Sequence, residues 1–312
     1  MTGLRSLVLS LSTGSILLFF SEHLFWARAR PGDSLGNWAR TWLAYSLLAF
    51  IFLSAVRHFR VRSLEALFLA GALVGWLGEG VLVQTMYDQF PLQISWTGLA
   101  WHALISVCVG WYALLLALSS KDAWRTTAIA SGVGAFWGLW AIFWWLEEPA
   151  DIATPAAFAA FAFGATGVLA LSYWAFARAG ARDFHPGRRS ISIALGVLLL
   201  VFALSTVPAT PRALIVLPTL LALVWMALER NRAAETRPDL LDRLGVERPP
   251  LGAYLPLGAM PIVACGIYAL AYVLGLRWQT NWIVYLVSMP AGFVLFAIVW
   301  LRLMRRQRPA TT

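Results

Sequence analysis

Apolar stretches close to 20 residues long follow one another along the whole of this 312-residue chain. A helix of that length crosses the roughly 30 Å of hydrocarbon in a bilayer. Unpaired backbone groups are not tolerated in lipid, and the absence of period-two alternation excludes a closed barrel. Only 12% of the residues are charged and 60% are hydrophobic, unlike a soluble globular domain. The sequence therefore predicts an all-α integral membrane protein, with residues 1–312 in a single membrane domain.

Charged and polar breaks divide the chain into about ten transmembrane helices in one polytopic bundle. The predicted spans are Ser6–Ala27, Trp38–Val56, Leu64–Met86, Thr97–Leu118, Ala123–Leu146, Ala153–Phe176, Ile191–Val207, Ala213–Leu228, Ala253–Leu276 and Trp282–Leu303. An even number of spans places both termini on the same side of the membrane. Ten spans are also the plan of carriers built as five-plus-five inverted repeats, but the charged spans of the first half have no counterparts in the second.

The distribution of basic residues predicts the orientation. Nineteen of the 24 Lys and Arg residues fall on the side of the termini, and five fall on the other side: Arg28, Arg30, Arg40, Arg212 and Arg277. The positive-inside rule then makes both termini cytoplasmic (N-in/C-in) in a plasma membrane, and 23 Arg against a single Lys favours a bacterial source with a GC-rich genome. Because the net charge of +9 is divided among short loops, it indicates topology and not a nucleic-acid partner.

Three segments outside the spans, or at their edges, carry separate predictions. The loop 229–250 is cytoplasmic, and its part around 239–244 forms either a short amphipathic helix on the membrane surface or a plain solvated connector. Residues 302–312 form a cytoplasmic basic tail. The sequence Ala27-Arg28-Ala29 resembles a signal-peptidase site, but the apolar run continues through Trp26, so the first helix is expected to stay uncleaved.

Ionisable side chains occur inside three of these spans. Glu22 and Glu79 both lie roughly 23 Å from the cytoplasmic edge, at 1.5 Å of rise per residue. His102 lies about 8 Å below the outer surface, which is the same layer of the membrane. An ionisable group in hydrocarbon costs roughly 2.5–3.5 kcal/mol on insertion scales, so it usually faces the protein interior and marks a working site.

Small residues spaced by four predict that two of these ionisable groups point into the bundle. The two helix faces consist of Gly71, Gly75 and Glu79 in the third span and of Gly98, His102, Ser106 and Gly110 in the fourth. Small residues at this interval let membrane helices approach closely, so both faces are expected to be helix contacts. In the first span, Ser15 and Glu22 are expected to share a face because they are seven residues apart.

Further polar groups surround this layer on its outer side. Those assigned to the candidate substrate-binding or proton-binding site are His23, Gln84, Tyr87, Asp88 and Arg40, in addition to Glu22, Glu79 and His102; Gln93, Glu147 and Glu148 lie nearby. The connecting segment 87–96 forms either a lid over the site or an ordinary interfacial loop. A purely structural alternative pairs Glu22 with Arg40 and makes His102 a hydrogen-bonded histidine of the bundle.

Two classes of function fit such a site. A carboxylic acid in a low-dielectric setting can hold a proton near neutral pH and exchange it when a cavity opens, which is typical of a secondary carrier for a small solute. Alternatively, Glu79 and His102 act as acid and base, or as metal ligands, in an integral-membrane enzyme that uses a lipid or isoprenoid. The sequence has no His-Glu-x-x-His motif, phosphate loop, nucleophile elbow or Cys-x-x-Cys pair, so it assigns no metal or cofactor. A scaffold subunit is a third possibility.

Overall fold

A computed structural model describes residues 2–244 and 248–306. The described chain is all-helical, with 82% of it in helices and no strand. Ten of its helices are long and apolar enough to cross a membrane. The predicted all-helical fold and the predicted number of long helices are therefore confirmed for this part of the chain, and they fit a multi-pass membrane protein. The predicted tail 302–312 lies partly outside the described residues.

The long helices begin and end close to the predicted boundaries, and several contain π-helical turns. In the first half they are α1 (Thr2–Leu18) continued by η1 (Phe19–His23) and α2 (Leu24–Trp26), α3 (Leu35–His58), α4 (Leu64–Leu77) continued by η2 (Gly78–Leu82), η4 (Ile94–Leu114) continued by α5 (Leu115–Ser119), and α6 (Ala123–Glu147). In the second half they are α7 (Pro155–Ala179), α8 (Arg188–Val201) continued by η6 (Phe202–Thr206) and α9 (Val207–Ala209), α10 (Ala213–Ala234), η7 (Leu251–Gly258) continued by α12 (Ala259–Val273), and α13 (Thr280–Met304).

Side-chain caps fix the starts of four of these helices. Ser34, Ser63, Asp122 and Thr154 each accept a hydrogen bond from the backbone N–H three residues further on, which satisfies an otherwise unpaired donor of the first turn. The largest difference from the predicted boundaries is at α10, which continues to Ala234. The first part of the predicted loop 229–250 is therefore helical.

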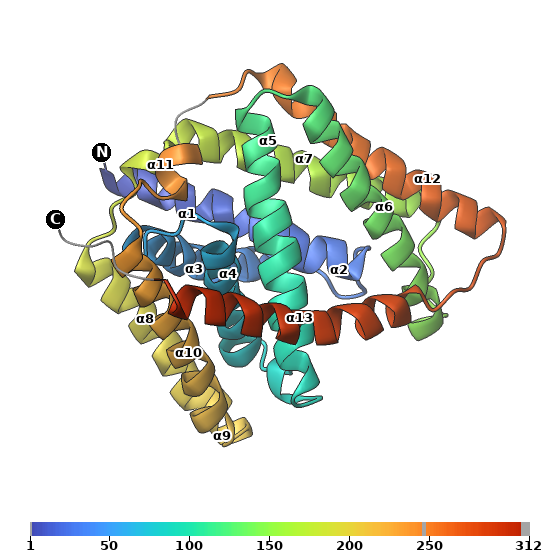
Figure 1. The fold of residues 1–312 in the computed structure, drawn as a ribbon. Coiled ribbons are helices and arrows are strands. Elements are labelled where there is room, and N and C mark those ends of the chain that lie inside the picture. The colour runs from blue at the N-terminus through green and yellow to red at the C-terminus, as the bar shows by residue number, and fades with distance from the viewer. Residues whose placement is uncertain (1, 245–247, 307–312) are drawn as a thin grey trace.

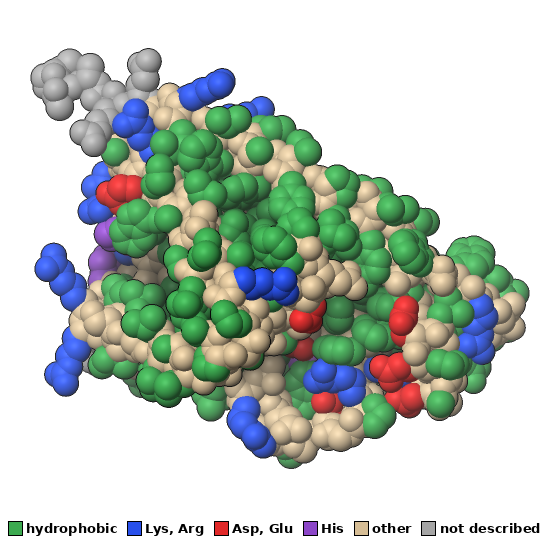
Figure 2. Space-filling model, turned by 90° about the horizontal axis from the view of Figure 1, so that it is seen from below, with side chains coloured by type: hydrophobic (Ala, Val, Ile, Leu, Met, Phe, Trp, Pro, Cys, Tyr) green, Lys and Arg blue, Asp and Glu red, His purple; other side chains and the backbone are tan. Residues whose placement is uncertain are grey.

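The segment formed by η4 and α5 runs through the middle of the molecule, with α4 and α13 packed against it (Figure 1). Most of the span Leu64–Leu82 is buried, 72% of its most apolar part, against 11% for Thr280–Met304. Thus α4 is an interior helix, whereas α13 lies at the periphery and directs apolar side chains outward. Hydrophobic side chains also cover much of the face shown in Figure 2.

The start of α1 and the end of α13 lie at the same end of the molecule (Figure 1). Ion pairs tie the segments together at this end, and they join Arg5 to Asp183, Arg57 to Asp239 and Asp242, and Arg306 to Glu65. A short helix, α11 (Leu240–Leu244), lies in this region. Its three leucines are buried in the protein core, so the segment is neither a plain solvated connector nor a helix with its apolar face free for a membrane surface.

Candidate functional site

The side chains of Glu79 and His102 meet in the interior between α4–η2 and η4. His102 Nε2 lies 2.9 Å from Glu79 Oε1. The side chain of His102 is 3% exposed and that of Glu79 is 12% exposed. Glu79 and His102, which were predicted to lie at the same depth, are therefore in direct contact. Because their surroundings are largely desolvated, a charge on one side chain acts strongly on the other.

Glycines bring the two helices close enough for this contact. A Cβ atom on Gly71 would meet the Cα of Ala103 at 2.9 Å, and one on Gly75 would overlap the backbone of Gly98. Trp76 Nε1 donates a hydrogen bond of 3.0 Å to the carbonyl of Ile94, which fixes the start of η4 against α4. The helix contact therefore has the close approach that the spacing of small residues predicts.

A short chain of hydroxyl groups continues from the other ring nitrogen of His102. Ser21 Oγ lies 3.0 Å from His102 Nδ1 and 2.9 Å from Ser106 Oγ. On the opposite side of the pair, Thr85 donates a hydrogen bond to the second carboxylate oxygen of Glu79. A histidine, a carboxylate and three hydroxyl groups thus form one buried network, in which low dielectric strengthens each bond.

This network can be hydrogen-bonded in two protonation states. When both nitrogens of His102 carry protons, Nδ1 donates to Ser21, Ser21 donates to Ser106, and Ser106 donates to the carbonyl of Trp101 at 3.5 Å. When Nδ1 carries no proton, Ser21 donates to it and Ser106 donates to Ser21. The hydroxyl groups of Ser21 and Ser106 can therefore pair with either form of the His102 ring by rotating.

Glu22 approaches the same region from the first helix. Its carboxylate accepts hydrogen bonds from Tyr45 Oη at 2.8 Å and from Trp26 Nε1 at 3.0 Å. The Tyr45 ring lies 6.4 Å from the ring of His102, centroid to centroid, and Glu22 is near enough to Glu79 and His102 for their charges to interact. Two carboxyl groups and one imidazole therefore lie in the same interior region.

All three ionisable residues lie in π-helical segments: Glu22 in η1, Glu79 in η2 and His102 in η4. Such turns are rare and occur frequently at functional sites. The turn at η1 also explains why one prediction is wrong. Ser15 bonds Ser172 on α7 at 2.7 Å while Glu22 bonds Tyr45 on α3, because the wider turn between them shifts the register of the helix.

His23 and Arg40 lie apart from this group. The His23 ring packs 4.6 Å from the Trp38 ring and 5.7 Å from the Phe161 ring, centroid to centroid. Arg40 is exposed, and its Nε donates to the carbonyl of Gly36 at 3.4 Å. The suggested pairing of Glu22 with Arg40 is therefore wrong, because Tyr45 and Trp26 hold the carboxylate instead.

The remaining predicted residues lie on the connection after η2. Gln84 Nε2 donates to Ser205 Oγ at 2.9 Å, and Asp88 is exposed. Tyr87 is buried and donates to the carbonyl of Gly80 at 2.9 Å, and burial raises the pKa of Tyr87 to about 12. The residues just before and at the start of the predicted lid, in η3 (Thr85–Tyr87), thus fold back onto η2 and cover Glu79, whereas residues 88–92 of the predicted lid are exposed.

Three residues of the network were not predicted from the sequence. Ser21, Tyr45 and Thr85 are uncharged, and such residues are common in membrane helices as packing elements. Ser21 directly precedes Glu22, and this was the one local signal that could have identified it. Nothing near Tyr45 or Thr85 distinguishes them before the helices are placed in space.

The described residues contain no group of three or more His, Cys, Asp or Glu side chains arranged to hold a metal ion. Three cavities, of about 900, 740 and 490 Å³, lie elsewhere, and none of the three is lined by Glu22, Glu79 or His102. Comparison with known protein families, curated proteins and solved structures gives no match to this chain. The fold and the buried network together define the class of protein. Its described part is all-helical, and ten of the helices are long and apolar enough to cross a membrane. An ionisable pair, Glu79 and His102, lies between two of these helices.

Proposed function

We propose that this chain is a multi-pass plasma-membrane protein that carries a small solute and couples its movement to a proton. In this proposal Glu79 binds the coupling proton, His102 provides its counter-charge and Glu22 supplies a second carboxylate. The single observation that carries the proposal is the hydrogen-bonded contact between Glu79 and His102, at 2.9 Å, inside a span that is mostly buried. Ionisable residues kept at such positions are typical of proton relays in transporters.

The enzymatic alternative has less support from the geometry. An acid and a base that act on a lipid must lie beside a cavity that holds the substrate. Glu79 and His102 are engaged with each other, and neither lines the cavities of about 900 and 740 Å³. A carrier, in contrast, opens its site to one side of the membrane only during part of its cycle.

Proteoliposomes with an entrapped pH-sensitive dye test the proposal. Purified wild-type protein is challenged with separate pools of amino acids, sugars, organic cations and organic anions. We expect at least one pool to change the lumenal pH, Glu79→Gln to abolish that change, and the matched exposed variant Asp88→Asn to retain it. If no pool changes the pH beyond that of empty liposomes, or if Glu79→Gln behaves as wild type, the proposal is wrong.

A further inference from the structure

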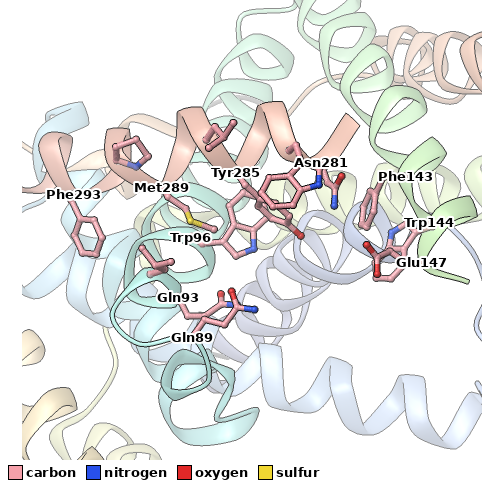
Figure 3. Close-up of a pocket in the computed structure, with 14 residues that line it drawn as sticks. Gln89, Gln93, Trp96, Phe143, Trp144, Glu147, Asn281, Tyr285, Met289 and Phe293 are labelled. Carbon is pink, nitrogen blue, oxygen red and sulfur yellow. The ribbon is translucent and has the colours of Figure 1, made fainter. Parts of the chain in front are cut away.

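A separate cavity of about 900 Å³ opens between the start of η4, the end of α6 and α13 (Figure 3). We propose that it binds an organic ion with a primary ammonium group attached to an apolar body. The side chains that line the cavity support this assignment, which is independent of the proposed carrier function.

Aromatic rings make up much of the cavity wall. They are Trp96, Phe143, Trp144, Trp282, Tyr285 and Phe293. The rings of Trp96 and Tyr285 pack edge to face with centroids 4.5 Å apart, and those of Phe143 and Trp144 also lie 4.5 Å apart. Such a wall accommodates an apolar body, and its ring faces attract a cation through the quadrupole of the aromatic system.

Two amide groups in the wall have hydrogen-bonding capacity left over. Asn281 is only 6% exposed, and its Oδ1 has no hydrogen-bond partner. Gln93 Oε1 is likewise buried without a partner. Buried polar atoms are nearly always paired, so two unpaired acceptors in one cavity indicate a ligand that brings N–H or O–H donors.

The charge of the lining favours a cation. Glu147 is the one charged side chain among the 14 lining residues, and it acts electrostatically on the hydroxyl of Tyr285. None of the 14 lining residues is an arginine or lysine; Arg28 binds Glu148, and Arg212 binds the carbonyl of Tyr87. An anionic ligand would therefore find no opposite charge in the cavity, whereas an ammonium ion would find Glu147.

A primary ammonium group fits better than either a quaternary ammonium or a neutral alcohol. Its three N–H groups can donate to the Glu147 carboxylate and, where a side chain turns toward the ligand, to an unpaired amide oxygen of the wall. A quaternary ammonium keeps the charge but offers no donor, and an alcohol offers one donor without the charge. The site is therefore expected to rank these three chemistries, with the primary ammonium first.

Titration calorimetry on the full chain in phosphatidylcholine nanodiscs tests this ranking, with empty nanodiscs as the baseline. The probes are 2-phenylethylammonium, its N,N,N-trimethyl derivative and 2-phenylethanol. We expect saturable one-to-one binding of the primary ammonium, and at least about tenfold weaker binding of the other two, since charge-assisted hydrogen bonds are the strong ones. Equal affinities for the three probes, or no saturable heat with the first, would overturn the proposal.

A matched pair of variants locates the site. Glu147→Gln is expected to weaken binding of 2-phenylethylammonium about tenfold. Glu148→Gln, the same change one position along on a side chain that binds Arg28, is expected to leave the affinity unchanged. Unchanged affinity in Glu147→Gln would contradict the assignment. Glu79→Gln is expected to bind as wild type does, so failure of the carrier proposal and failure of this one can be told apart.

Discussion

Gly75 and Gly98 touch backbone to backbone where α4 crosses η4. A Cβ atom on Gly75 would overlap the carbonyl oxygen of Gly98 and would lie 2.7 Å from its Cα. Glu79 is one helical turn beyond Gly75, and His102 is one turn beyond Gly98. The distance between the two ionisable side chains is therefore set by a contact between glycines that carry no chemistry of their own.

Gly75→Ala should separate the helices and weaken the pair. Since the obstacle is backbone, the added methyl group cannot be relieved by a side-chain rotation, and overpacking of this kind costs about 1–3 kcal/mol. The matched control is Gly132→Ala on α6, where an added Cβ meets nothing within 4 Å. Thermal unfolding in detergent should show a lower midpoint for Gly75→Ala and no loss for Gly132→Ala. Equal midpoints for the two variants would contradict the close contact.

The coupling between Glu79 and His102 can be measured with a double-mutant cycle. Glu79→Gln, His102→Gln and the double variant are compared with wild type by unfolding in mixed micelles. Residues in direct contact show interaction energies of about 0.5–3 kcal/mol, whereas independent residues are additive. We expect a coupling within that range. Additivity of the two single changes would mean that the side chains do not interact in the folded protein.

The sequence predicted the ten long helices and the inward direction of Glu79 and His102 because both follow from local regularities. The length of each apolar run predicts a membrane-spanning helix, and the spacing of the glycines predicts which face of a helix contacts its neighbour. The sequence did not predict the contact of Tyr45 with Glu22 or the cavity lined by Gln93, Glu147 and Asn281. The cavity forms only when α13 packs beside η4 and α6, which lie more than a hundred residues earlier in the chain.

Register errors have a different cause. Ser15 and Glu22 were assigned to one face by counting regular turns, and the π-helical turn at Phe19–His23 breaks that count. Such a turn is a single wide turn inside an otherwise regular helix and has no simple sequence signature. A charged residue beside it, such as Glu22, is a warning that helical periodicity can fail there.

Arg57 holds together three segments at the end of the molecule where α1 starts and α13 ends, and its removal should loosen them. Its guanidinium binds Asp239 and Asp242 at 2.9 Å and donates to the carbonyl of Phe184 at 3.1 Å, with the side chain only 16% exposed. Removing one partner of a buried ion pair leaves the other charge unpaired and costs roughly 3–5 kcal/mol of folding stability. Because Arg57 is partly exposed, we expect Arg57→Ala to lower the free energy of unfolding by about 3 kcal/mol.

Limited trypsin digestion of the folded protein measures the loosening. In Arg57→Ala, cleavage after Arg182 and Arg243 should become faster, since their segments lose the contacts that hold them. Arg62→Ala is the control, because Arg62 makes one exposed hydrogen bond, to the carbonyl of Pro238. Equal cleavage rates in Arg57→Ala and Arg62→Ala would show that Arg57 does not hold these segments.

The stability of the folded protein is expected to depend on pH through the carboxyl group of Glu235. Its hydrogen bond with Arg237 lowers the pKa of the Glu235 carboxyl. A carboxyl with a lowered folded-state pKa contributes stability above its unfolded-state pKa, and this contribution is lost as the pH falls through the folded-state value. Wild type should therefore be more stable than Glu235→Gln at pH 7, and the difference should shrink on acidification.

Thermal unfolding of both proteins between pH 7 and pH 3 checks this. Comparing wild type with Glu235→Gln separates the effect of Glu235 from that of Asp239. Burial raises the pKa of the Asp239 carboxyl, so the contribution of Asp239 to stability changes with pH in the opposite direction. A difference between the two proteins that stays constant over the whole range would contradict a role for the Glu235 carboxylate.

The orientation proposed from the basic residues can be tested at two exposed positions on opposite ends of the molecule. Asp88 lies on the connection between η2 and η4, and Arg125 lies in the first turn of α6. In a background without Cys108 and Cys265, Asp88→Cys should react with a membrane-impermeant maleimide in intact cells, whereas Arg125→Cys should react only after lysis. This pattern requires cytoplasmic termini, because an even number of spans links both ends to the side of Arg125. The reverse labelling would invert the topology, and it would place Glu79 near the inner face instead of the outer one.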